Sequence, residues 1–469
     1  MDFTPLANLL SGSQVAVLQA FCHRGGMSLH LFDSSGQSTR GGSFQVFQLL
    51  VPLEAALRPA GETRPMTIQL RHNGSGRYEL SHTFELASIP ARVILDPRFR
   101  LPNHPPPGMP APQGIPVTDR ATDPEVLAAV GRLVPELTRG YSEERILAAE
   151  TELGVRLPED LRALYRLAGD THEEQWLLGA FDLLPLDALE RGAIVADDRV
   201  FAINPVVYEA YPAGHVKRVS SNDWWITFAG DHAGNNLAAD LDPAPAGRIG
   251  QLIEHGRDVH GPVGYVAGSV TELLLTAARD KRAGHAPHPP YSEAHAVGDR
   301  PAASLVAEFT DPLAPQELFL NDAGPLDLAE LAPLRNLRLV SVNRAPSVAL
   351  TMPHDLPLES LSIDAGSTDL APLAGHPTLW HLTLRRVTEP VSILPLQSLS
   401  RLIYLDLSGA TVTDLETVAS LEGLRVLALN PGQWRRLGTI PESLAAAELS
   451  GFAELGEALD WAARIRAGH

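Results

Sequence analysis

The sequence has 469 residues, of which 44% are hydrophobic and 20% are charged, a balance typical of folded domains rather than disordered chains. A chain of this length exceeds one ordinary hydrophobic core, so we expect several domains. Its formal net charge is −19, which argues against a nucleic-acid-binding protein because such proteins carry a basic face. The single cysteine, Cys22, excludes an intramolecular disulfide and a cysteine metal cage.

The opening residues, MDFTPLANLLSGSQ, lack the basic and long apolar regions of a signal peptide. No stretch approaches the roughly 18 uninterrupted apolar residues that a membrane-spanning helix requires. We therefore expect a cytoplasmic protein with no membrane partner.

Two proline-rich stretches divide the sequence, because dense proline favours extended linkers over helix or sheet interiors. The predicted α+β multidomain organisation is a first block at 1–95, a linker at 96–118, a middle block at 119–280, a linker at 281–302 and a third block at 303–469. The second linker holds His285, His288 and His295 without fixed spacing, so we expect solvated residues rather than a metal site there.

The first block has a helical pattern near Pro5–Phe21, followed by alternating segments that predict an antiparallel sheet. These segments read MSLHLFD, SFQVFQLLV, MTIQLRH and YELSHTFEL. The turn sequences SSG and NGSG between them are typical of hairpins. We expect a small α+β domain that carries no recognisable motif.

The third block contains a leucine pattern, L-x-x-L-x-L, that recurs every 21 to 23 residues. Its clear copies start at Leu337, Leu358, Leu379, Leu402 and Leu424. This period is typical of leucine-rich repeats, in which each repeat adds one strand to a parallel sheet. We expect a C-terminal leucine-rich repeat solenoid with parallel strands, ending in a capping helix over ELGEALDWAARIRAGH.

Residues that alternate with the buried leucines lie on the opposite face of such a sheet. In leucine-rich repeat proteins this concave face is the usual partner-binding surface; the alternative is that a short array only supports a neighbouring domain. The candidate partner-binding residues here are His381, Thr383, Arg385, Tyr404 and Asp406. The columns expected to face solvent also include Leu339, Ser341, Asn343, Ser360, Ser362, Asp364 and Ser408.

The middle block opens with two helical patterns joined by a tight turn. Ser142 can cap the first helix, and Gly154 can end it in the left-handed conformation. Pro158 suits the first position of the second helix, where its missing N–H costs nothing. Glu150 follows Ile146 at i+4 and therefore lies at the edge of an apolar stripe.

At this corner the sequence resembles the SUKH superfamily, which carries E-x-x-L-G-x-x-L-P-x-D before a mixed sheet; here the pattern runs from Glu150 to Asp160. The likeness continues through FDLLPLDALERG, through W-x-x-F-x-x-D-x-x-G-x-x-L-x-x-D-x-x-P from Trp225 to Pro243, and through VGYVAGSVTELLLTAA. It covers about Val126 to Arg279. The segment AGD at 168–170 departs from the Asn-Gly that many members carry.

The resemblance implies a SUKH-like α+β domain with a mixed sheet and no catalytic activity. Bacterial members are commonly immunity proteins that bind and neutralise secreted toxins, and fungal relatives act in cell-wall regulation. The middle-block residues we select as partner-binding candidates are Glu150, Trp224, Trp225 and Asp231.

Two adjacent tryptophans on a strand point to opposite faces of a sheet. Either one ring is exposed, as a binding hot spot beside acidic groups, or both rings pack in the core. Asp231 begins DHAGNN, which lacks the spacing of a calcium loop, so we predict a hairpin turn. Asp240 and Asp242 would point the same way from a strand, either as a divalent-cation site or as a solvated strand end.

No P-loop, HExxH or GxSxG motif is present, so we predict no catalytic, cofactor-binding or metal-binding residue and no cofactor. We expect a non-enzymatic interaction protein, of the immunity type, that occludes a toxin domain; the acidic charge would suit a basic toxin. The alternative is an intracellular scaffold or regulator that binds partners through its repeat face. An enzyme hidden in the first block is a third hypothesis.

Overall fold

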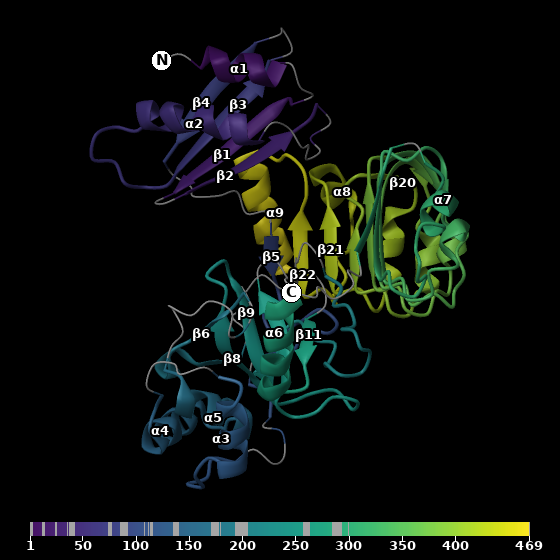
Figure 1. Ribbon diagram of the computed structural model, residues 1–469. Coiled ribbons are helices and arrows are strands. Elements are labelled where there is room, and N and C mark those ends of the chain that lie inside the picture. The colour runs from purple at the N-terminus through teal and green to yellow at the C-terminus, as the bar shows by residue number, and fades with distance from the viewer. Residues whose placement is uncertain are drawn as a thin grey trace. The chain divides into compact units, whose positions relative to one another are not determined.

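The computed structural model (Figure 1) forms two compact units, residues 1–97 with 292–469 (unit 1) and residues 98–291 (unit 2). Unit 2 is thus inserted in the sequence of unit 1. The residues that the structure describes are 3–11, 15–23, 26–34, 36, 43–73, 77–84, 92–106, 108–110, 112, 116–134, 140–169, 178, 180–192, 205–256, 263–283, 293–298 and 300–468.

The N-terminal part of unit 1 is a four-stranded antiparallel sheet whose core is shared with two helices. The strand order is β2 (Gly26–Phe32), β1 (Val17–His23), β3 (Met66–His72) and β4 (Tyr78–Thr83). Helices α1 (Thr4–Ser11) and α2 (Ser43–Leu57) pack their apolar side chains against one face of these strands. This confirms the expected α+β architecture of the block.

Two elements of the block differ from the prediction. The segment SFQVFQLLV, predicted as a strand, lies in helix α2. Its buried residues Val46, Leu50 and Leu53 follow a helical spacing, but a continuous apolar run hides that period. The helix predicted over Pro5–Phe21 ends at Ser11, and Val17 already begins β1.

The C-terminal part of unit 1 is a long sheet in which successive strands pair in parallel. Its parallel strands are β12 (Glu293–Val297), β13 (Glu317–Asn321), β15 (Leu339–Ala349), β16 (Ser360–Thr368), β17 (His381–Arg385), β19 (Tyr404–Asp406), β21 (Val426–Leu429) and β22 (Ala446–Leu449). The leucines of the predicted pattern lie in register, as in the row Leu361, Leu382, Leu405 and Leu427, and fill one core. The predicted parallel strands are confirmed; the leucine-rich repeat solenoid stays a prediction.

Short elements complete this part of unit 1. Strand β14 (Leu326–Asp327) pairs with β15, while β18 (Val387–Val391) pairs in parallel with β20 (Ala410–Val412). Helices α7 (Ala302–Val306) and α8 (Pro431–Arg436) and several short 3₁₀ helices connect the strands. The predicted capping helix is α9 (Leu455–Ala467), which buries Trp461 and Ile465 in the same core.

Unit 2 contains a six-stranded sheet in the order β11 (Gly264–Ala267), β10 (Gln251–Gly256), β9 (Asn235–Asp240), β8 (Trp225–Gly230) and β6 (Asp182–Leu183), with β7 (Glu190–Arg191) also on β8. Its described strands all pair antiparallel, so the prediction of a mixed sheet is wrong for this part of the chain. The reason is connectivity: β8 to β11 follow one another through short links, and a parallel pair needs a long crossover.

The α-helices in the described part of unit 2 are α3 (Pro124–Gly131), α4 (Glu143–Leu153), α5 (Glu159–Leu167) and α6 (Val270–Ala283). Helical and sheet residues such as Ile146, Leu164, Phe228 and Leu274 share one core. A second, smaller core lies around Trp225. Among the described residues of the chain, no helix has the length and apolarity to cross a membrane.

Part of the first proline-rich stretch packs within unit 2. Leu101 is buried, and the ring of His104 hydrogen-bonds the carbonyl oxygen of Pro205 through Nε2 at 3.0 Å. The carboxylate of Asp223 accepts hydrogen bonds from the backbone N–H groups of Gly108 and Met109 at 2.6 and 2.7 Å. In the second stretch, His285, His288 and the side chain of His295 lie outside the described residues. The predicted domain boundaries stay predictions.

Candidate interaction groove at a helix corner

The two helices of the E-x-x-L-G-x-x-L-P-x-D segment meet at a tight corner. The hydroxyl of Ser142 accepts a hydrogen bond from the backbone N–H of Arg145 at 3.3 Å and so caps α4, as predicted. Gly154 ends α4 at a φ of 70°, the left-handed conformation that favours glycine. Pro158 precedes α5 as its N-cap residue, one position earlier than predicted.

Glu150 stabilises this corner from inside. Its side chain is 0% exposed, and its Oε1 accepts a hydrogen bond from the backbone N–H of Leu157 at 2.8 Å. Its Oε2 forms an ion pair with Arg162, whose second guanidinium nitrogen pairs with Glu143 at 2.6 Å. A fully buried carboxylate cannot touch a partner, so our selection of Glu150 as a partner-binding residue is wrong. It sits inside because these bonds satisfy its charge.

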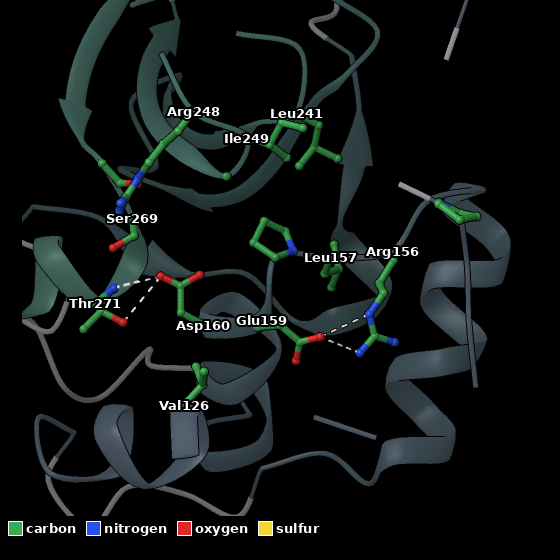
Figure 2. A pocket seen from close by; sticks show the side chains of 14 residues that line it. Val126, Arg156, Leu157, Glu159, Asp160, Leu241, Arg248, Ile249, Ser269 and Thr271 are labelled. Atoms are coloured by element: carbon green, nitrogen blue, oxygen red, sulfur yellow. Dashed lines mark hydrogen bonds and ion pairs between the residues drawn. The ribbon is translucent and has the colours of Figure 1, made fainter. Parts of the chain in front are cut away.

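The same corner lines a groove of about 500 Å³ (Figure 2). Three segments far apart in the sequence form most of its walls: the corner at 156–160, the β9–β10 connection at 241–250 and the start of α6 at 268–271. Pro116 and Val126 complete the lining. Leu157 and Leu241 are buried in its lining, whereas Ile249 is 53% exposed. The groove therefore offers apolar surface that is open to a partner.

The charged side chains that line the groove already form hydrogen bonds or ion pairs with other residues of this domain (Figure 2). Asp160 accepts a hydrogen bond from the backbone N–H of Thr271 at 3.1 Å, and so caps the N-terminus of α6. Arg156 pairs with Glu159 at 2.7 Å. The Nε–H of Arg248 donates to the carbonyl oxygen of Gly268. With its charges engaged internally, the groove is suited to an apolar side chain.

Gly250 allows the two sides of the groove to approach each other. Its φ is +85°, and a Cβ built at this position would lie 3.1 Å from Cβ and Cγ of Pro158. A side chain there would strain the backbone and press against the corner. Among the described residues that line the groove, none is a histidine or a cysteine. The described lining therefore has no pair of a nucleophile with a histidine base, and its open apolar surface is suited to binding a partner.

Both adjacent tryptophans are buried. Trp224 packs in the core shared with the helices, under the guanidinium of Arg191, which lies 4.8 Å from the ring centroid. Trp225 belongs to the second core and stacks on His255. The prediction that the rings face opposite ways is confirmed. The alternative of an exposed tryptophan is wrong, because each face of the sheet is covered at this position.

Asp231 organises the turn between β8 and β9, and the predicted hairpin is confirmed. Its carboxylate accepts hydrogen bonds from the backbone N–H groups of Ala233 and Asn235 at 2.8 and 2.9 Å, and from the amide side chain of Asn235 at 2.7 Å. Burial alone would raise the pKa of Asp231, but these bonds lower it. Its selection as a partner-binding residue stays untested.

The paired aspartates Asp240 and Asp242 are bonded to other side chains. Asp240 is fully buried and accepts a hydrogen bond from Gln251 at 2.8 Å, so it does not form a solvated strand end. Burial raises its pKa to about 6. Asp242 forms an ion pair with Lys217 at 2.5 Å. No group of three or more His, Cys, Asp or Glu that could hold a metal occurs among the described residues.

The candidates in unit 1 lie on adjacent parallel strands, with His381 opposite Tyr404 and Thr383 opposite Asp406. The rings of His381 and Tyr404 stack with centroids 4.3 Å apart. Of these described residues, Arg385 is exposed, whereas Thr383 and Asp406 are buried. The expectation of a solvent-facing column is therefore wrong for its buried members, which also include Leu339 and Ser360, whereas its other residues are partly or fully exposed. Strands about 4.8 Å apart place in-register side chains in contact, which removes them from water.

Burial also changes the protonation of this face. Burial, aided by the positive charge of Arg385, lowers the pKa of His381 to about 3, so the ring is neutral near pH 7. Ser360 Oγ lies 2.8 Å from His381 Nδ1. Burial raises the pKa of Asp406, against the hydrogen bonds of Ser408. Whether these residues bind a partner is untested.

Sequence reasoning missed the groove residues Arg248, Ile249 and Ser269 and the cap that Asp160 provides. One signal was available: Ser269 and Glu272 have the S-x-x-E spacing of a capping box, which marks the start of α6. The approach of this helix start to the corner depends on tertiary packing, which that spacing does not reveal.

Known proteins match the region that contains the corner. The model of the SMI1/KNR4 family (SUKH-1) matches residues 140–276. The cell wall biosynthesis/cell cycle regulator smi1 of Schizosaccharomyces pombe is 32% identical over 146 residues, which are 31% of this chain and 25% of that protein. The cell wall assembly regulator SMI1 of Saccharomyces cerevisiae is 35% identical over 77 residues, which are 16% of this chain and 15% of that protein.

A KNR4/SMI1 homolog of Yarrowia lipolytica is 44% identical over 72 residues, 15% of this chain and 10% of that protein. The chain thus spans a quarter or less of the length of these curated relatives. The match covers the corner, the sheet of unit 2 and the start of α6. Residues 140–276 of this chain are an SMI1/KNR4 (SUKH-1) family domain.

Proposed function

We propose that this chain is a non-enzymatic regulatory scaffold, and that its SMI1/KNR4 domain binds a protein partner in the corner groove. The groove is the observation that carries the proposal. It combines open apolar surface at Ile249 with charges that are already bonded internally, at Asp160 and Arg156. Such a surface gains free energy from an apolar side chain of a partner without leaving a charge unpaired.

The names of the relatives support a regulatory role. The two yeast proteins that match this domain are called regulators of cell wall biosynthesis or assembly. A scaffold that binds other proteins can perform such regulation without catalysis of its own. The proposal includes the location expected from the sequence, the cytoplasm.

The immunity role is a second, narrower candidate. The net charge of −19 favours it, because an acidic protein would associate rapidly with a basic toxin domain. In that case the groove, or the face of unit 1 around Arg385, would cover the active site of the toxin. The two roles differ in the identity of the partner rather than in the mode of binding.

A photo-crosslinking amino acid at position 249 tests the binding surface in the cells that make the protein. Leu275 is the matched control, because it is an aliphatic residue of unit 2 that is 40% exposed and does not line the groove. We expect a crosslinked partner from position 249 that is absent from position 275. The substitution Ile249→Glu should remove that partner in a separate capture experiment, whereas Leu275→Glu should retain it.

The identity of the captured protein separates the two roles. A regulator or enzyme of envelope synthesis would support the scaffold, and a secreted toxin encoded nearby would support the immunity role. For the latter, co-expression of this chain should restore growth of toxin-expressing cells. Equal crosslinking from positions 249 and 275, or none from either, would contradict binding in the groove.

A further inference from the structure

The last parallel strand of unit 1, β22, is not left as a free edge. Strand β5 (Arg92–Ile94) lies beside β22 (Figure 1) and pairs with it antiparallel. In this pairing Ile94 lies opposite Ala446, Val93 opposite Ala447 and Arg92 opposite Glu448. An unpaired edge strand exposes backbone N–H and C=O groups that can recruit another chain. Here a segment from more than three hundred residues earlier in the sequence occupies those groups.

A buried side chain and backbone hydrogen bonds hold β5 in this position. The side chain of Val93 is 1% exposed and packs in the leucine core of the parallel strands β12 to β22, which we call the array, whereas Ile94 is 46% exposed. Beyond the strand, the backbone N–H groups of Leu95 and Asp96 both donate to the carbonyl oxygen of Ala445, at 2.8 and 3.0 Å. The segment therefore closes the core as well as the hydrogen-bonding edge.

Ion pairs add to these contacts. The carboxylate of Asp96 lies 3.1 Å from the guanidinium of Arg425, and Glu448 lies 3.6 Å from Arg92. Both pairs are partly exposed, so each contributes little by itself. They join the β5 segment to the last two parallel strands: Arg425 directly precedes β21, and Glu448 lies in β22.

The direction of β5 separates it from the repeating pattern. Among the described strands of this sheet, the pairs from β12 to β22 are parallel, and the pair of β5 with β22 is antiparallel. Immediately after β5 the chain leaves for unit 2, which begins at residue 98. The strand is thus an addition to the array and not one of its repeats.

We propose that residues 92–96 are a self-supplied cap strand, and that the edge of β22 recruits β22 of a second copy when the cap is lost. An antiparallel pair of identical edges is a closed two-fold contact, so the expected product is a dimer rather than a fibre. The cap keeps the 469-residue chain from associating through this edge. A chain that begins at residue 98 lacks the cap.

The substitution Val93→Asp in the full-length chain tests the proposal, because it places a carboxylate in the array core and expels the strand. Ile94→Asp is the matched control: it adds the same charge to the same strand, on its exposed side. We expect Val93→Asp to double the molar mass measured by light scattering, while Ile94→Asp and the unmodified chain keep the same lower mass. An excess of the peptide ARVILDP, which supplies the cap in trans, should return Val93→Asp to that mass, and a scrambled peptide should not.

Hydrogen exchange identifies the cause of any association. The amides of β16 and β17 should stay protected in Val93→Asp, which shows that the array is folded. If they lose protection, the variant Asp96→Lys tests the cap instead, because the lysine repels Arg425 without entering the core. In that variant the rate of hydrogen exchange at Ala446–Glu448 should rise at least threefold. Unchanged mass in folded Val93→Asp, association that the peptide does not reverse, or unchanged exchange in Asp96→Lys would each overturn the proposal.

Discussion

Arg162 of α5 is 1% exposed and forms an ion pair with Glu150 of α4, which is 0% exposed. This pair joins the two helices whose connecting turn lines the groove. Because the carboxylate also accepts the hydrogen bond of Leu157, one residue fixes both the helix pair and the turn between them. The shape of the groove therefore depends on charges that no partner can reach.

Removal of the Arg162 side chain should strongly destabilise the fold, because it leaves the carboxylate of Glu150 buried without a counter-charge. We expect Arg162→Met to lower the free energy of unfolding by about 3–5 kcal/mol, measured by urea denaturation. The double variant Glu150→Gln/Arg162→Met should recover about 2 kcal/mol, since glutamine removes the charge and keeps an acceptor for the Leu157 N–H. No recovery in the double variant would argue against an uncompensated charge as the cause.

Arg120 provides the control for this experiment. Its side chain is 69% exposed and lies 3.4 Å from Asp123, so the pair is a surface ion pair of the same domain. Arg120→Met should change the free energy of unfolding by at most about 1 kcal/mol.

Sequence patterns predicted elements that depend on local spacing. The leucine period placed Leu361, Leu382 and Leu405 correctly in register, because these leucines recur at buried positions of successive parallel strands. Caps such as Ser142 and Gly154 were also predictable, since each acts within a few residues. Helix α2 was missed because it is apolar around much of its circumference, with Phe44 exposed and Val46 buried.

The candidate site was harder to predict because it is assembled from distant segments. Leu157, Ile249 and Thr271 line one groove, yet nothing in the local sequence brings them together. The opposite error occurred at Glu150 and Trp224: charge and aromatic character marked them as binding residues, while their burial depends on neighbours elsewhere in the chain. Sequence alone identified the domain and misplaced its surface.

Gly250 offers a direct test of how closely the groove walls approach. Gly250→Ala introduces a Cβ at a positive φ and 3.1 Å from Pro158, so we expect a loss of about 2–3 kcal/mol in unfolding free energy. Gly108→Ala is the control, because its φ is +87° and no atom lies within 4 Å of its added Cβ. That variant should lose only about 1–2 kcal/mol, the cost of the left-handed conformation. Equal losses would show that the contact with Pro158 is relaxed without cost.

His381 should make unit 1 sensitive to mild acid. Its pKa falls from 6.5 to about 3, chiefly through burial, so protonation is favoured in the unfolded chain. For a base with a lowered pKa, the stabilising contribution is fully present above pH 6.5 and declines as the pH falls toward 3. At pH 5 the loss for this residue is about 2 kcal/mol, from 1.5 pH units at about 1.4 kcal/mol each.

The variant His381→Gln isolates this contribution, because glutamine cannot titrate and keeps polar atoms near Ser360. The variant also loses the stacking on Tyr404, which lowers stability at every pH, so the informative quantity is the change with pH. Urea denaturation at pH 7 and pH 5 should show that the stability advantage of the unmodified chain over the variant shrinks by about 2 kcal/mol. Parallel stability curves for the two proteins would mean that His381 titrates normally, and hence that water reaches the ring between β16 and β19.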